Sequence, residues 1–323
     1  MNTKSQKVLG VFLASISIFF WGITFVSTKY LLNSFSPVEI LFYRFIAAYI
    51  GLWLIRPKFE KIAAKDNILF ALAALTGVVL YQFTENIAIH FTNASNVSVI
   101  VSICPLFTAI ISQLVLKEKH INRWFIVGFI ISISGVTLVC FNGNTELEFN
   151  PKGDLLALTS GICWGFYSLF ISVTNKRKYD PVCATRRIFF FSVLLMIPLS
   201  LISIGITKHT GLTSLTSSAS ELAASMFFSF GKSINAARFS NPFNWLNLLF
   251  LGIVASGLCF TAWNKACNIT GTVKVNCGIY LIPVVTIIFA FFILGEKITL
   301  LGAIGALITI TGLFISEKTT SDV

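Results

Sequence analysis

YQFTENIAIHFTNASNVSVIVSICP, from Tyr81 to Pro105, decides the fold because it places polar groups inside a long apolar tract. Its side chains include Glu85, Asn86 and His90. Hydrocarbon offers such groups no hydrogen-bond partner, so each must face protein or water. A carboxylate near the middle of a bilayer costs about 2.5–3.5 kcal/mol on the insertion scale. We therefore interpret this stretch as part of a polar site inside a membrane.

A second stretch has the same pattern 178 positions later. It is CFTAWNKACNITGTVKVNCGIYLIP, from Cys259 to Pro283. At this offset Asn86 falls on Asn264, and the proline that ends the first stretch falls on the proline that ends the second. We expect the rest of the chain to hold these two polar-lined segments face to face.

The composition is that of an integral membrane protein. The chain has 323 residues, of which 55% are hydrophobic and only 11% are charged, against about 25% charged residues in soluble domains. Its mean hydropathy is +0.84. The seven cysteines lie in or beside apolar runs without a CxxC pair. That pattern is typical of small core residues and not of metal ligands or disulfides.

Ten apolar segments are long enough to be membrane-spanning helices, which need about 20 residues each. They are residues 9–30, 37–55, 68–90, 95–115, 122–141, 153–173, 182–204, 245–268, 272–294 and 299–315. The first lacks a cleavage site and is too long for a signal peptide, so we expect it to be retained. A bacterial plasma (inner) membrane is the expected location.

The distribution of basic residues predicts the orientation. The net charge is +11, and thirteen Lys and Arg lie in the connections on one side of the predicted membrane against five on the other. Basic connections stay in the cytoplasm, so we expect both termini there and residues 205–244 outside. The charge is then an insertion signal, and we expect no nucleic-acid partner.

Matching residues in the two halves predict an internal repeat. The matches keep their order along five helix pairs. They are Trp21-Gly22 with Trp164-Gly165, Tyr43-Arg44 with Arg186-Arg187, the two polar stretches, and Gly128, Ser132 and Gly135 with Gly305, Thr309 and Gly312. Because each unit has an odd number of helices, the second must be inserted upside down, as in secondary transporters. A duplication in a protein that transports nothing is the alternative.

We therefore expect an all-α integral membrane protein with ten transmembrane helices in two inverted five-helix repeats. The expected repeats are residues 1–145 and 146–323, with the 205–244 loop inside the second.

These motifs resemble the EamA branch of the drug/metabolite transporter superfamily. The resemblance rests on the two Trp-Gly pairs, SPVEILFYRF at 36–45, ASNVSVI at 94–100 with its later proline, and GEK at 295–297 before a glycine-rich last helix. No single motif is decisive, but the ordered set is specific and covers essentially the whole chain. The resemblance implies a ten-helix bundle that exports, and sometimes imports, amino acids and other small metabolites. It also implies a central cavity lined mainly by helices 1, 3, 4, 6, 8 and 9.

Glu85 is the strongest candidate for a functional residue because it is the only acidic residue far from a helix end. A proton carrier, or a counter-ion to a cationic group of the substrate, is the functional interpretation. A buried salt bridge that holds helices together is the structural one. Tyr81 lies four residues earlier and shares its face of the helix.

The other predicted substrate-binding residues are Trp21, Asn96, Trp164, Asn264, Lys265 and Lys274. The two tryptophans recur in the repeat, although aromatic side chains on a helix often belong to the core. Either lysine can meet a substrate carboxylate or pair with Glu85, and Lys265 can instead reach the membrane surface. Because Lys274 aligns with Asn96, the two halves differ chemically at that place.

Four further residues have gating or structural interpretations. Arg44 and Arg187 lie within the second and seventh helices, where each can bind the carbonyl end of a neighbouring helix, and Glu39 is a further partner for Arg44. Pro105 and Pro283 can break the fourth and ninth helices and free backbone carbonyls for a site or a hinge.

The sequence holds no recognisable catalytic constellation. His90, His120 and His209 are far apart, and HExxH, GxSxG and P-loop motifs are missing. We expect no enzyme activity, no metal and no cofactor, so that transport draws on a solute or ion gradient, most simply on protons through Glu85.

We interpret the chain as a secondary transporter of small metabolites such as amino acids or their derivatives, with export favoured over import. A multidrug or organic-cation exporter and a non-transporting sensor or assembly protein are the alternatives. The expected partners are a small-molecule substrate, the bilayer and protons, and the expected oligomeric state is a monomer or homodimer.

The orientation can be tested by cysteine labelling or by reporter fusions. Residues 205–244 should be reached from outside the cell and residues 56–67 only from the cytoplasm, because the basic connections hold the second group inside. Finding the two segments on the same side would contradict the inverted repeat.

Overall fold

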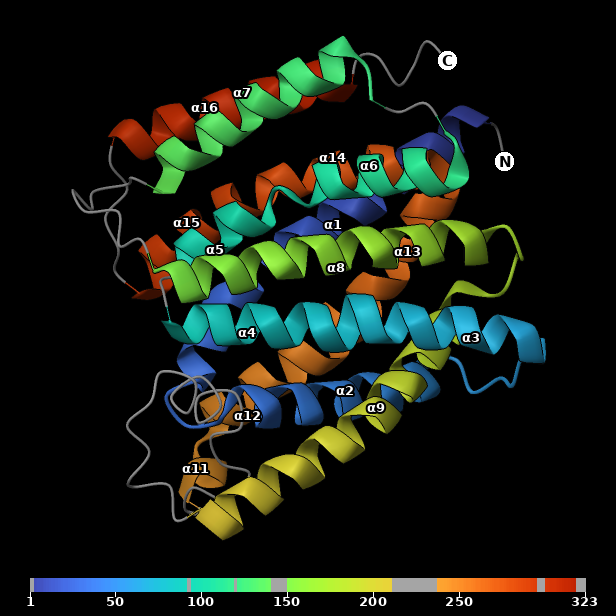
Figure 1. Cartoon of the computed structure of the whole chain (residues 1–323), viewed down its shortest axis with the longest axis vertical. Helices are drawn as coiled ribbons and strands as arrows, with labels where there is room; N and C mark the ends of the chain where they lie inside the picture. Colours follow the sequence, from blue (N-terminus) through green and yellow to red (C-terminus); the bar gives the residue numbers. More distant parts are fainter. Residues whose placement is uncertain are drawn as a thin grey trace.

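The structure is a computed structural model that describes residues 3–91, 94–118, 121–140, 150–210, 237–294 and 300–317. Every regular element in these ranges is a helix (Figure 1). Those of the first half are α1 (Thr3–Leu31), α2 (Pro37–Ile55), α3 (Ala64–Ala73), η1 (Ala74–Leu80), α4 (Tyr81–Phe91), α5 (Ala94–Val101), α6 (Cys104–Leu116) and α7 (Arg123–Cys140). Those of the second half are α8 (Pro151–Asn175), α9 (Pro181–Thr210), α11 (Ala237–Ser240), α12 (Pro242–Leu249), η2 (Phe250–Leu258), α13 (Cys259–Thr270), α14 (Thr272–Cys277), η3 (Gly278–Leu281), α15 (Ile282–Leu294) and α16 (Leu300–Glu317).

The all-helical membrane fold is confirmed. In the described residues, seven helical segments are long and apolar enough to cross a membrane, and three shorter apolar helices accompany them. Each of the ten predicted segments overlaps one of these, although the predicted helix 95–115 consists of two helices, α5 and α6. Of the predicted external loop at 205–244, α9 takes the part up to Thr210 and α11 begins at Ala237. The part between them lies outside the described residues.

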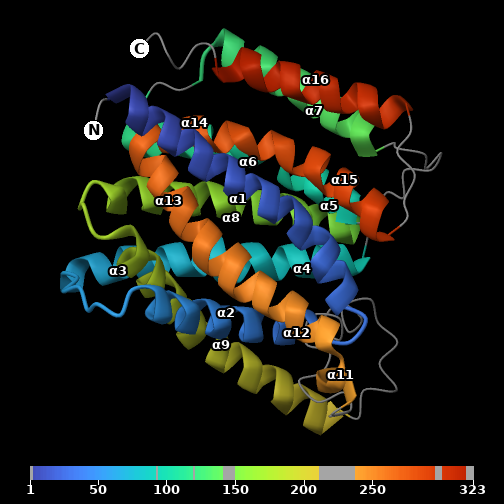
Figure 2. The ribbon, with the colours of Figure 1, turned by 180° about the vertical axis from the view of Figure 1, so that it is seen from behind.

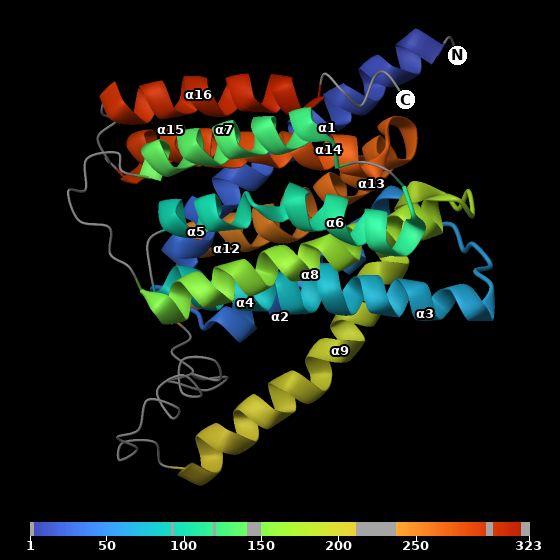
Figure 3. The ribbon, with the colours of Figure 1, turned by 45° about the horizontal axis from the view of Figure 1, so that its top comes forward.

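The two halves pack on each other in a reciprocal pattern. The first helix of the first half, α1, lies against α13 and α15, and the first helix of the second half, α8, lies against α4 and α6. In the same way α2 packs on η2, while α9 packs on η1. Figure 2 shows the crossing of α1 and α13. Because α1 begins at the end of the bundle where α8 finishes (Figures 1 and 3), the halves run in opposite directions.

Both halves interrupt their helices at equivalent places. A π-helical segment, η1 or η2, lies inside the third and the eighth span and ends at Leu80 and at Leu258. The fourth span is broken after Val101, and α6 restarts with Pro105 in its first turn, where proline needs no N–H partner. The ninth span passes through a 3₁₀ turn, η3, before Pro283. The predicted breaks at the prolines are therefore present.

Small residues let α7 and α16 approach closely at one edge of the bundle (Figure 3). A Cβ atom added at Gly135 would lie 2.6 Å from the carbonyl oxygen of Gly305 and closer still to the amide nitrogen of Thr309. Ser132 donates a hydrogen bond to the Thr309 carbonyl at 3.3 Å. Close backbone approach of this kind is how helices associate in lipid, where no hydrophobic force drives them together.

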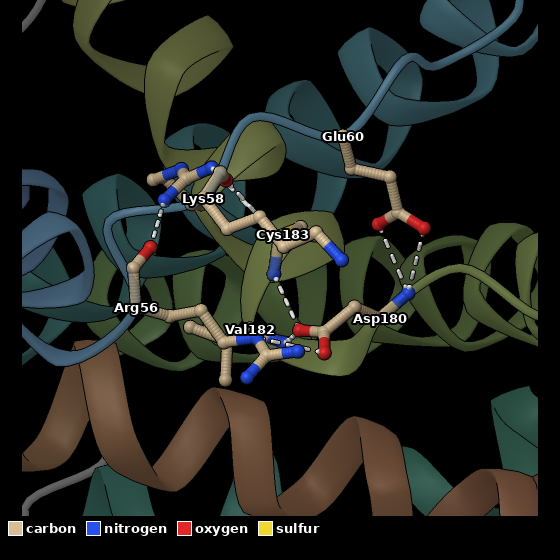
Figure 4. Close-up of polar contacts among 7 residues, drawn as sticks. Arg56, Lys58, Glu60, Asp180, Val182 and Cys183 are labelled. Carbon is tan, nitrogen blue, oxygen red and sulfur yellow. Dashed lines mark hydrogen bonds and ion pairs between the residues drawn. The ribbon is translucent and has the colours of Figure 1, made fainter.

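At one end of the bundle, Asp180 joins the 56–63 connection to the start of α9 (Figure 4). Its carboxylate accepts hydrogen bonds from the amides of Val182 and Cys183, at 3.0 and 3.2 Å, and so caps the helix. The same carboxylate pairs with Arg56 at 3.0 Å. Its own amide donates to the carboxylate of Glu60 at 3.0 Å. One residue thus links the two halves.

Further bonds strengthen this end. The guanidinium of Arg186 donates to the carbonyls of Arg56 and Lys58 in the same connection. Asp66, at the start of α3, pairs with Arg177 at 3.5 Å. At the opposite end of the bundle a different pair joins the halves, since Arg238 lies 2.9 Å from a carboxylate oxygen of Glu39.

Gly135→Ala tests the seam between α7 and α16. In a helix without a close neighbour, alanine stabilises by about 1 kcal/mol relative to glycine. Because backbone atoms of α16 occupy the place of the added methyl group, we expect the substitution instead to lower the free energy of unfolding, by about 1–3 kcal/mol. Thermal unfolding in detergent measures the sign.

Ser134→Ala, on the exposed face of α7, is the control and should change stability little. A more stable Gly135→Ala protein would contradict the close approach of the two helices.

Candidate functional site

A cavity lies in the interior between the two halves. Helices of both halves line it. Its lining residues are Trp21, Thr24 and Phe25 of α1, Arg44 of α2, Tyr81, Gln82 and Glu85 of α4, Val101 and Cys104 beside the break before α6, Trp164 of α8, Phe260 of α13, Ile279 of η3 and Ile282 of α15. The spans involved are the first, second, third, fourth, sixth, eighth and ninth. This is the set that the resemblance implied, with the second helix added.

The two halves give the cavity chemically different walls. The first half supplies the hydroxyl groups, both charges and the carboxamide together with Trp21, Phe25 and Val101, while the second half supplies only Trp164, Phe260, Ile279 and Ile282. A site that combines polar groups with aromatic and aliphatic surface suits an amphipathic solute.

Glu85 and Arg44 bring opposite charges to this cavity. Both side chains are buried, with exposures of 8% and 5%. The Glu85 carboxylate interacts with the side chain of Tyr81, one helical turn earlier on the same face. Arg44 is held from the other half, because its Nε donates to the hydroxyl of Ser256 at 3.0 Å. The two charges are close enough to interact, yet no direct ion pair joins them within the described part of the chain.

The tryptophans offer the cavity their rings and not their N–H groups. Trp21 donates its indole N–H to the Ala255 carbonyl at 2.9 Å, and Trp164 donates to the side-chain oxygen of Asn276 at 2.6 Å. The two rings meet edge to face, with centroids 5.4 Å apart. The ring of Tyr81 lies 5.0 Å from that of Trp164. Since their polar atoms are already paired, these residues contribute aromatic surface to a solute.

Three of the predicted substrate-binding residues lie elsewhere. Asn264 is buried in a packed network, where it accepts a hydrogen bond from the Tyr167 hydroxyl at 2.8 Å and donates to Thr185 at 3.2 Å. Lys265 is exposed and Lys274 is half-buried, and neither lines the cavity. The fourth, Asn96, falls outside the described side chains. The structure thus brings Trp21, Tyr81, Glu85 and Trp164 together.

The residues with gating or structural interpretations also separate. Arg44 lines the cavity, whereas Arg187 donates to the side chain of Asn67 at 2.9 Å, in the first turn of α3. Pro105 and Pro283 are buried beside the helix breaks, next to the cavity residues Cys104 and Ile282. The prolines therefore lie next to lining residues but do not line the cavity themselves.

Sequence reasoning did not select Gln82 or Phe260, which are a matched pair of lining residues. They lie 178 positions apart, the offset that relates the two polar stretches. Gln82 lies one turn before Glu85, so helical spacing from the carboxylate was a usable signal for it. Phe260 is apolar, so only its alignment with Gln82 in the internal repeat could have identified it as a lining residue.

Among the residues that the structure describes, no group of three or more His, Cys, Asp or Glu side chains can hold a metal ion. The chemistry open to the site is binding and proton exchange by its ionisable and amide groups.

A family model described as the EamA-like transporter family matches this chain at residues 8–141 and again at residues 210–317. The chain is also similar to an uncharacterized transporter of Archaeoglobus fulgidus, with 27% identity over 98% of both chains. An uncharacterized transporter of Bacillus subtilis, YyaM, is 24% identical over 95% of this chain and 92% of its own length.

Two further similarities bear on membrane and fold. The uncharacterized inner membrane transporter YhbE of Escherichia coli is 26% identical over 55% of this chain and 58% of its own. A solved crystal structure superposes with a TM-score of 0.66 over 97% of this chain and 96% of the other, at 14% identity. At that identity the likeness concerns the fold alone.

Trp164→Phe tests the bond that fixes the aromatic wall. The substitution keeps an aromatic ring but removes the 2.6 Å donor to the buried oxygen of Asn276, which keeps only the long 3.5 Å hydrogen bond from Ser168. We expect the free energy of unfolding to fall by about 1–3 kcal/mol, because this buried oxygen loses its short hydrogen bond. Adding Asn276→Leu should recover part of this loss, because the buried side-chain oxygen that lost its indole donor is then removed as well.

Trp245→Phe makes the same change at an indole that is 48% exposed and donates to the Phe239 carbonyl. Water can replace that donor, so the loss should be smaller. Equal losses in detergent unfolding at both positions would contradict the role assigned to the buried bond.

Proposed function

We propose a substrate class and a coupling group for this chain, which belongs to the EamA-like transporter family of the drug/metabolite transporter superfamily. It is a multi-pass membrane transporter and not an enzyme. Its solutes, in our proposal, are small zwitterionic or amphipathic metabolites, with amino acids and their derivatives first. Export is the proposed direction, and both termini lie in the cytoplasm.

The observation that carries the proposal is the separate presentation of Arg44 and Glu85 to one cavity. A zwitterion placed between them sets its carboxylate toward the guanidinium and its ammonium toward the carboxylate. Both groups of the solute are then paired in a low-dielectric site, where an unpaired charge is costly. The aromatic rings that line the cavity take the apolar part of the solute.

Arg44 also bears on the alternative of an organic-cation exporter. A buried guanidinium beside Glu85 repels a cation that carries no negative group of its own. A zwitterion or a neutral solute meets no such repulsion, so the pair of charges favours metabolites over cationic drugs.

Alternating access requires that each end of the bundle opens in turn. The pairs Arg56–Asp180 and Arg238–Glu39 lie at opposite ends, and each joins a residue of one half to a residue of the other. In our proposal these pairs break alternately as the halves move. The Arg44–Ser256 bond lies between the two ends, beside the solute.

Glu85 is the proposed proton-coupling residue, because its carboxylate is buried and lines the cavity beside Tyr81 and Arg44. In Glu85→Gln the side chain keeps its size and its carbonyl acceptor but cannot exchange a proton. In proteoliposomes tested with a panel of radiolabelled amino acids, we expect exchange across the membrane to persist. Accumulation driven by a pH gradient should be lost.

Glu60→Gln, at the end of the bundle, is the matched control and should keep driven accumulation. If a well-folded Glu85→Gln protein accumulates solute with the pH dependence of the parent, Glu85 is not the coupling group. If the parent binds solutes but moves none, the chain is a sensor and the transport proposal is wrong.

A further inference from the structure

We propose that Gln82 recognises an amide-type group on the solute, that is, a carbonyl acceptor next to an N–H donor on a largely flat molecule. This inference rests on the proposed function only in that the central cavity receives a solute. It adds a specificity-determining residue and narrows the proposed zwitterionic or amphipathic solutes to those that also carry a carboxamide, lactam or similar group.

Gln82 is the lining side chain whose hydrogen-bonding capacity is left open. It is 3% exposed, and neither its side-chain oxygen nor its side-chain nitrogen has a partner among the described residues. A carboxamide offers one acceptor and two donors in one plane. Water can satisfy these atoms while the cavity is empty. A solute that displaces the water must supply both kinds of partner or leave the amide unpaired.

Two buried amides of the second half, Asn264 and Asn276, do not share this property, and the singly unpaired amides of Asn86 and Asn244 lie outside the cavity lining. Asn264 accepts a hydrogen bond from Tyr167 and donates one to Thr185. Asn276 accepts from Trp164 and donates to the carbonyl of Thr272. At both, donor and acceptor are used inside the protein, which is the expected state of a structural amide. Gln82 differs because its partners have to come from the cavity.

The surroundings of Gln82 predict the shape of the solute. Phe260 occupies the equivalent position in the other half and lines the same cavity, so the lining combines an amide with aromatic rings. The rings of Tyr81 and Trp164 lie close by, 5.0 Å apart. Flat groups pack well on aromatic rings. A flat solute whose edge carries the amide satisfies both features.

The test compares nicotinamide with 3-acetylpyridine by calorimetric titration of the purified full-length protein in detergent. The two probes share a pyridine ring and a carbonyl acceptor, but only nicotinamide carries the N–H donor. A site built to pair a donor discriminates strongly against an analogue that lacks it. We expect nicotinamide to bind about tenfold more tightly to the parent protein.

Gln82→Met should erase this difference, because methionine has a similar length and no amide. It should not lower the unfolding temperature, since no partner inside the protein is lost. Gln113→Met is the matched control. Gln113 is half-buried, lies outside the cavity and accepts a hydrogen bond from the amide of Ile121 at 3.1 Å. That variant should keep the tenfold difference.

Equal binding of the two probes by the parent, or no measurable binding of nicotinamide, would overturn the proposal. So would a difference that survives in Gln82→Met. These results leave the transport assay untouched. If the protein accumulates amino acids but binds the two probes equally, only the inference about Gln82 is wrong. If it distinguishes the probes but transports no solute, only the transport proposal is wrong.

Discussion

A membrane interior cannot solvate the polar groups of a protein, and this constraint organises the whole bundle. Arg44 and Glu85 are buried where lipid offers no partner. The Arg44 guanidinium is accommodated there because it donates a hydrogen bond to Ser256 of the other half, and the Glu85 carboxylate interacts with Tyr81 and Arg44. A polar site of this kind has to lie where the halves meet, since protein surrounds it there on every side.

The spans and the helix breaks were predictable because chain composition encodes them directly. A run of apolar residues has to be long enough to cross the bilayer, and a proline such as Pro105 or Pro283 removes a backbone donor at a fixed place. Glu85 was predictable for a similar reason, since a lone carboxylate in an apolar tract needs a protein environment. These features depend on local sequence and on the surrounding solvent.

The other members of the site were harder to predict because they depend on which helix faces meet. Lys274 and Lys265 were plausible partners for Glu85, but the cavity places Arg44 of a different helix there. The π-helical segments add a second difficulty. Their hydrogen bonds span one residue more than α-helical ones, so helical spacing counted across Ala74–Leu80 does not give the face of the residues beyond. Arg44 and Arg187 illustrate the limit, since they occupy equivalent positions yet contact Ser256 and Asn67.

The two π-helical segments also carry information about ancestry. They end at Leu80 and Leu258, positions related by the offset that aligns the two polar stretches. An irregularity acquired separately in each half would have no reason to end at equivalent residues. The simplest history is that a single five-helix ancestor already had the widened turn before its gene was duplicated. The backbone irregularity beside the cavity then predates the duplication, whereas the lining side chains changed after it. Gln82 and Phe260, at equivalent positions, are one such difference between the two copies.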